Sequence, residues 1–178
     1  MKNIFSLFIL FLLFSCADSK SEAERINDLY KKDLVVLQDE VVELQHLVET
    51  DAASKQLQIQ FLKVHQSYKR VEPICEYYFP TVSKAINGPA LDEYEIDEGM
   101  TVPPAGLQVI EEYLFPEFDL ITKNDLLKEI GILNANLYRL EMVSKTNDLT
   151  DSSVFDAMRL EVFRIITLGI TGFDFPIA

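Results

Sequence analysis

The chain has 178 residues, of which 48% are hydrophobic and 25% are charged, a composition typical of one globular domain. Its formal net charge is −13. All 29 acidic residues and all of the 16 basic residues except Lys2 follow residue 16, so the remainder of the chain carries a net charge of −14. Such a charge repels nucleic acid and anionic lipid headgroups, and we exclude nucleic-acid binding on this ground.

The first 16 residues, MKNIFSLFILFLLFSC, predict a targeting segment. Lys2 gives a positive start, and the apolar run from Ile4 to Phe14 has the length of a signal-peptide core but is short for a membrane span. The run ends in LFSC, and a small residue directly before a cysteine resembles the bacterial lipoprotein signal. In that family the cysteine, here Cys16, is lipidated and becomes the mature N-terminus. The alternative is an ordinary cleaved signal with an incidental cysteine.

The lipoprotein reading predicts a membrane anchor at Cys16, a short polar tether over residues 17–22, and a helical domain over residues 23–178. The location would be the cell envelope of a Gram-negative bacterium, either facing the periplasm or on the surface. Cys75 is then left alone, so an intrachain disulfide is excluded. The sequence holds no CxxC or CxxCH motif, which argues against both structural zinc and covalent c-type haem in this chain.

Two long amphipathic helices are predicted first, over Ser21 to Thr50 and over about Ala53 to Ile86. Pro73 predicts a kink in the second helix, and Pro80 predicts that the helix bends or ends there. The apolar stripes of the two helices are Ile26, Tyr30, Leu34, Leu37, Val41, Leu44 and Val48, and Leu57, Phe61, Val64, Tyr68, Val71, Cys75, Tyr78 and Val82.

Residues 87–104 predict an acidic loop, because they open with Asn-Gly-Pro, lack a helical period and contain five acids. Pro103 and Pro104 then favour the start of a short helix. Thr122 with Asp125 predicts the cap of a fourth helix, and Thr150 or Asp151 the cap of a fifth. The buried stripes of these three helices are predicted as Leu107, Ile110 and Leu114; Leu126, Ile130, Leu133, Leu137 and Leu140; and Val154, Met158, Val162, Ile165 and Gly169. The fold class is all-α, an up-and-down bundle of about five helices.

Several polar residues lie beside these stripes and form a candidate metal or polar site. His65, Glu72 and Glu76 share a narrow arc of the second helix, while Gln108 and Glu111 border the short helix. Inward-pointing carboxylates on facing helices are how bundles build metal sites, and oxygen-rich sites suit iron or calcium. The simpler alternative is that the glutamates line a solvated flank and that His65 packs at the border of the core. We expect Cys75 to be a core residue and His46 to be exposed.

The stretch GLQVIEEYLF resembles the signature of imelysin-like proteins, Gly-x-His-x-x-Glu on a helix. Gly106 and Glu111 match that signature, and Gln108 stands where the family has histidine. A glutamine amide is a weak oxygen donor, whereas a neutral imidazole is a good metal ligand.

A closer resemblance covers most of the chain after the signal. The blocks YKRVEPICEYYFPTVSKAINGPALDEYE, VPPAGLQVIEEYLFPE and GITGFDFP resemble the N-terminal helical region of Bacteroidetes-type cytochrome-c peroxidases, where an imelysin-like segment precedes a di-haem region of the MauG type. The chain stops where that region would begin, so we expect a fragment or a split module. The resemblance implies a lipid-anchored accessory module without catalysis or cofactor of its own, with a c-type haem peroxidase region or redox partner. The alternative is an imelysin-like lipoprotein that binds iron or calcium, and a peptidase ranks third.

Overall fold

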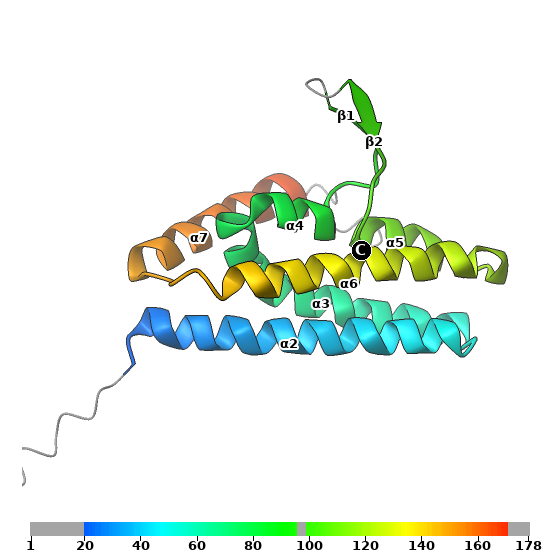
Figure 1. Ribbon diagram of the computed structural model, residues 1–178, viewed down its shortest axis with the longest axis horizontal. Helices are drawn as coiled ribbons and strands as arrows, with labels where there is room; N and C mark the ends of the chain where they lie inside the picture. Colours follow the sequence, from blue (N-terminus) through cyan, green and yellow to red (C-terminus); the bar gives the residue numbers. More distant parts are fainter. Residues whose placement is uncertain (1–19, 96–98, 171–178) are drawn as a thin grey trace, which may run out of the picture.

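The computed structural model describes residues 20–95 and 99–170, so the predicted signal segment and Cys16 lie outside the described residues. The described part contains six α-helices, which confirms the all-α prediction (Figure 1). Their bounds are α2, Glu22–Glu49; α3, Ser54–Tyr78; α4, Pro80–Asn87; α5, Leu107–Leu114; α6, Lys123–Ser144; and α7, Asp151–Arg164. A five-residue π-helix, η2 (Ile165–Gly169), continues α7. No helix among these residues is both long and apolar enough to cross a bilayer.

The long helix α2 packs along both α3 and α6, while the shorter helices α4, α5 and α7 cover the other side of the bundle (Figure 1). The core is built from the apolar stripes predicted for the three long helices, whose central residues are almost fully buried. Burying each Leu, Val or Phe side chain of these stripes contributes about 1.5–3 kcal/mol, so their packing determines the bundle. Cys75 is among the buried residues, as predicted, and His46 is exposed.

The second predicted helix is two helices. Helix α3 continues through Pro73 and ends at Tyr78, and α4 begins with Pro80 at its first turn. Proline suits a first helical turn because its missing N–H has no partner there anyway. The prediction that Pro80 bends or ends the helix is therefore confirmed, and the helix count rises to six.

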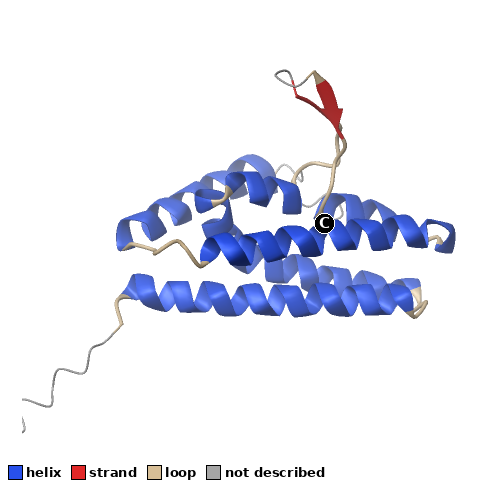
Figure 2. Ribbon diagram, viewed as in Figure 1, coloured by secondary structure: helices blue, strands red, loops and turns tan. Residues whose placement is uncertain are grey.

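The acidic loop contains a small antiparallel sheet, which the sequence reading missed. Strands β1 (Glu93–Glu95) and β2 (Met100–Val102) pair with Tyr94 opposite Thr101. Figures 1 and 2 show this hairpin standing clear of the helices. Tyr94 and Met100 are 66% and 50% exposed, so the hairpin contributes little to the core and extends a surface away from it.

One of the two predicted caps is correct. Thr150 caps α7, because its hydroxyl accepts a hydrogen bond from the Ser153 amide at 3.2 Å. Thr122 makes no such bond and instead donates to the Asp119 carbonyl at 2.8 Å. A 3-10 turn, η1 (Leu120–Thr122), precedes α6 and is itself capped by the Asp119 side chain. Thr122 therefore precedes α6 at the predicted N-cap position, but its side chain makes no capping hydrogen bond, so the predicted capping pair with Asp125 is wrong.

The last helix faces the bundle with a different side from the one predicted. The residues that point inward are Val154, Ala157, Glu161, Arg164 and Leu168, at steps of three and four. Met158, Val162 and Ile165, predicted to be buried, are 60%, 56% and 53% exposed. Helix α7 therefore turns charged side chains toward the protein and large apolar side chains away from it.

Candidate functional site

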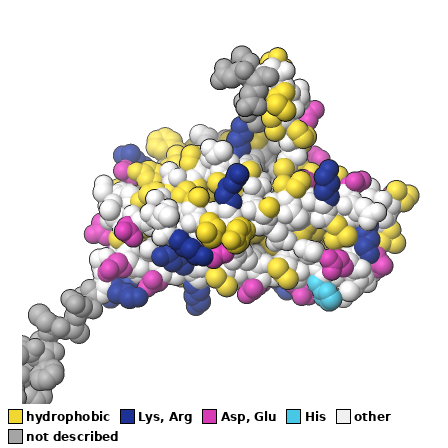
Figure 3. All heavy atoms as spheres, in the orientation of Figure 1, with side chains coloured by type: hydrophobic (Ala, Val, Ile, Leu, Met, Phe, Trp, Pro, Cys, Tyr) yellow, Lys and Arg dark blue, Asp and Glu magenta, His cyan; other side chains and the backbone are white. Residues whose placement is uncertain are grey.

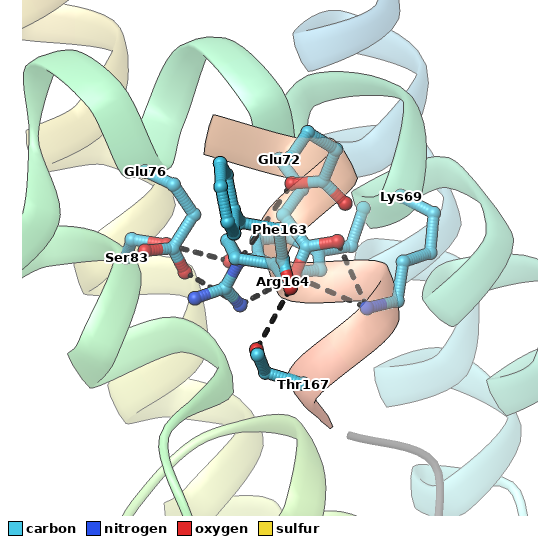
Figure 4. Close-up of polar contacts among 9 residues, drawn as sticks. Lys69, Glu72, Glu76, Ser83, Phe163, Arg164 and Thr167 are labelled. Carbon is cyan, nitrogen blue, oxygen red and sulfur yellow. Dashed lines mark hydrogen bonds and ion pairs between the residues drawn. The ribbon is translucent and has the colours of Figure 1, made fainter. Parts of the chain in front are cut away.

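The inward face of α7 brings Arg164 into a cluster of charges on α3 (Figure 4). Arg164 Nη2 lies 3.2 Å from Glu72 Oε1 and 3.1 Å from Glu76 Oε1. Its Nε lies 3.6 Å from Glu161 Oε2, one turn earlier on α7. One guanidinium thus joins carboxylates from two helices, and the planar group suits such multiple contacts.

Glu72 is the most deeply buried member of this cluster. Its side chain is 0% exposed, and Lys69, one turn earlier on α3, places Nζ 2.8 Å from Glu72 Oε2. A carboxylate at this depth is stable in its ionised form only where cations and hydrogen bonds compensate the loss of water. Lys69 and Arg164 supply that compensation from the two sides of the carboxylate.

A chain of hydroxyl groups connects the cluster with the core. Ser83 Oγ of α4 donates to Glu76 Oε1 at 2.6 Å, and the Tyr68 hydroxyl lies 2.8 Å from Ser83 Oγ. Burial raises the pKa of the Tyr68 phenol and raises the pKa of the Cys75 thiol to about 12. Both groups are therefore neutral at physiological pH, and the Cys75 thiol is not an activated nucleophile.

Of the predicted site residues, Glu72 and Glu76 are brought together by Arg164. Gln108 of α5 lines a pocket of about 310 Å³ together with Glu76 and Arg164. His65 lies two turns before Glu72 on α3, is 7% exposed, and has its ring 6.3 Å from the ring of Phe61. The expectation that the glutamates line a solvated flank is wrong for Glu72 and Glu111, which are 0% and 3% exposed.

Glu111 stands apart from the charge cluster. Its Oε1 is buried and accepts no hydrogen bond from the described residues. Burial, with a smaller contribution from Glu112, raises the pKa of Glu111 to about 7. Glu111 is therefore a buried carboxyl group that is half-protonated near neutral pH.

Across residues 20–95 and 99–170, no three His, Cys, Asp or Glu side chains are grouped so that they could hold a metal ion.

Replacing Glu111 with glutamine is expected to stabilise the protein in a pH-dependent way. The folded-state pKa of about 7 lies above the ordinary value of 4.5, so the folded form binds the proton more tightly than the unfolded form. The ionised carboxylate of Glu111 therefore destabilises the folded protein. This destabilisation is absent at acidic pH, grows as the pH rises from 4.5 to 7, and reaches roughly 3 kcal/mol above pH 7. Urea unfolding at pH 5 and pH 8 should show that Glu111→Gln stabilises mainly at pH 8. Glu117→Gln, at an exposed position that does not contribute to the raised pKa of Glu111, is the control. Equal gains at both pH values for Glu111→Gln would contradict the assignment.

The sequence did not predict the roles of Arg164 and Lys69, which pair with Glu72, or of Ser83, which donates a hydrogen bond to Glu76. The available signal was the spacing of Glu161 and Arg164, which puts two charges on the same helical row as Val154 and Ala157.

Comparisons of the chain with protein-family models, with curated proteins and with solved structures found no match.

Proposed function

We propose that the chain is a lipid-anchored helical accessory module, without catalysis of its own, that docks a positively charged c-type haem partner in a cytochrome-c-peroxidase-like system. The lipoprotein-type signal ending at Cys16 supports the anchor, and the sequence blocks quoted above support the kind of partner. The structural observation that supports docking is the acidic hairpin β1–β2, which stands clear of the bundle (Figure 2).

The hairpin combines the two features that a docking site for a basic redox protein needs. Its segment carries five acids within seven residues, which attract a basic partner over a distance set by the ionic strength. Tyr94, Met100 and Val102 are exposed and offer apolar contact on the same hairpin. Figure 3 shows hydrophobic side chains on this projecting part of the molecule. Aromatic residues and methionine are enriched in protein interfaces. The five acids are Asp92, Glu93, Glu95, Asp97 and Glu98.

The test is co-purification of haem-stained protein with the affinity-tagged, full-length chain from membranes of its host. We expect a c-type haem protein to be retained at low salt, and to be lost when the five hairpin acids are replaced by Asn and Gln. Deleting residues 89–103 should have the same effect.

The matched control neutralises five exposed acids on other elements: Asp39, Glu43, Glu49, Glu112 and Glu117. This variant has the same net charge as the hairpin variant, so a specific role of the hairpin leaves its haem partner bound. Equal loss in both variants would reduce the effect to net charge. Retention of the partner by the hairpin variant would contradict the docking role of the hairpin.

A further inference from the structure

We propose that the outward face of α7 and η2 rests on the surface of a lipid bilayer, with its apolar side chains among the headgroups. This inference rests on the lipid anchor of the proposed function and adds a second, non-covalent contact with the membrane. The face is defined by seven apolar residues that are 53–75% exposed: Phe155, Met158, Val162, Phe163, Ile165, Ile166 and Ile170. Part of it is visible in Figure 3, where hydrophobic side chains gather over α7.

The orientation of α7 is the first reason. A helix on the surface of a water-soluble bundle turns its apolar stripe inward and its charges outward. On α7, Glu161 and Arg164 instead point inward: Arg164 pairs with Glu76 of α3 and with Glu161 of its own helix. Seven large apolar residues within sixteen positions then remain outside, and contiguous exposed apolar patches mark sites of contact with proteins or membranes.

The position of α7 relative to the anchor is the second reason. The amide of Ala23, in the first turn of α2, donates to Asp151 Oδ1 at 3.2 Å, so the N-termini of α2 and α7 lie together. Glu22, where α2 begins, is six residues after Cys16, and six residues reach at most about 20 Å. A lipid at Cys16 therefore keeps the first turn of α7 within about 20 Å of the membrane surface.

The charge of the face is the third reason, and it selects the lipid over other occupants. Between Phe155 and Ile170 the chain has two carboxylates, Asp156 and Glu161, and Glu161 points inward. The exposed cation Arg159 is paired with Asp156 at 3.1 Å. The carboxylate of Asp156 is thus already neutralised, so the face offers a basic protein no unpaired negative charge. A second copy of a chain with a net charge of −14 is repelled. An uncharged, zwitterionic lipid surface meets neither objection.

The experiment is flotation of the chain from residue 16 onward, with Cys16→Ser so that no acyl chain is attached. Vesicles of phosphatidylcholine alone are compared with vesicles of phosphatidylcholine mixed with anionic phosphatidylglycerol. We expect the protein to float with phosphatidylcholine and to float less with the anionic mixture, because its net charge is negative. Phe163→Glu with Ile166→Glu should weaken binding at least about tenfold, since two apolar side chains leave the interface.

The control variant is Val35→Glu with Val42→Glu, which places the same charges on exposed apolar positions of α2. Circular dichroism and urea unfolding confirm that both variants are folded. Absence of flotation, or equal loss in the α2 variant, would overturn the membrane contact. A dimer that forms without vesicles and is dissociated by Phe163→Glu with Ile166→Glu would also overturn it, because the face would then bind a second copy of the chain. Since the assay uses a chain that cannot be lipidated, its result is independent of whether Cys16 is acylated, which labelling with radioactive palmitate tests separately.

Discussion

Replacing Arg164 with methionine is expected to lower the free energy of unfolding by about 3–5 kcal/mol. The substitution keeps most of the apolar stem but removes the guanidinium that lies 3.2 Å from Glu72 and 3.1 Å from Glu76. Glu72 is 0% exposed, so its charge would remain inside the bundle with Lys69 as the cation from α3. A loss of this size is a large part of the stability of an ordinary domain, and it should be measured by urea unfolding at neutral pH.

Two further variants separate the loss of the ion pair from the loss of any arginine. Arg159→Met removes an exposed arginine of the same helix and should cost no more than about 1 kcal/mol. Adding Glu72→Gln to Arg164→Met removes the buried charge that has lost its arginine partner, and should restore part of the lost stability. Two results would contradict this account of the ion pair. One is an Arg164→Met variant that loses no more stability than Arg159→Met. The other is a double variant whose loss equals the sum of the losses from Arg164→Met and Glu72→Gln alone.

Replacing Gly106 with alanine is expected to cost about 3 kcal/mol or more, from backbone strain together with a steric clash. Gly106 has φ of 95°, a conformation that glycine adopts readily and alanine does not. A Cβ atom at this position would lie 2.3 Å from the carbonyl oxygen of Ile86, at the end of α4. Because the obstacle is backbone, the start of α5 must move away from α4 to admit it.

Gly131 of α6 provides the matched control for Gly106, because a Cβ atom there would meet nothing within 4 Å. Gly131→Ala lies in a helix interior and should stabilise the protein by roughly 0.5–1 kcal/mol. Thermal and urea unfolding of the two variants should therefore shift in opposite directions. Similar midpoints for both variants would show that the close approach of α5 to α4 is not required.

Sequence periodicity was sufficient to predict the three long helices. Helices α2, α3 and α6 have 28, 25 and 22 residues, and their apolar stripes run along them. Turning another face of these helices toward the core would bury more charged side chains. Such long patterns average out single exceptions, which is why most of the buried apolar residues of these helices were predicted. The buried polar residues of α3, such as Gln60 and Ser67, lie outside the predicted stripe. The hairpin was missed because strands of three residues are too short to show alternation.

The orientation of α7 could not be obtained in this way. Two rows share Val154: one continues through Met158, Val162 and Ile165, and the other through Ala157, Glu161 and Arg164. Hydrophobicity alone favours the first row, whereas the structure turns the second row inward, with Ala157 buried and Glu161 and Arg164 only partly exposed. The choice depends on Glu72 and Glu76 of α3, which lie far away in the sequence and provide the partners for Arg164. Tertiary electrostatics therefore overrides the helical pattern at this helix.

Only part of the candidate site could be predicted, because its remaining contacts also depend on residues far apart in the sequence. The position of Glu72 and Glu76 beside the stripe of α3 followed from helical geometry, and the structure brings them together. Their partner Arg164 and the isolation of Glu111 depend on how α5 and α7 pack, which one sequence does not specify. Calorimetric titration with ferrous, ferric, calcium and zinc ions is the remaining test of the metal-binding alternative.

The orientation of α7 is tested most directly by thiol labelling of cysteines introduced one at a time into the Cys16→Ser chain, which retains Cys75. Ile166→Cys places a thiol on the outward face, Ala157→Cys places one on the inward face, and buried Cys75 serves as the internal reference. With a maleimide reagent, the thiol from Ile166→Cys should react as fast as one in an unfolded peptide. The thiol from Ala157→Cys should react as slowly as Cys75. Fast labelling at position 157 together with protection at position 166 would contradict the inverted orientation, and with it the membrane-facing surface.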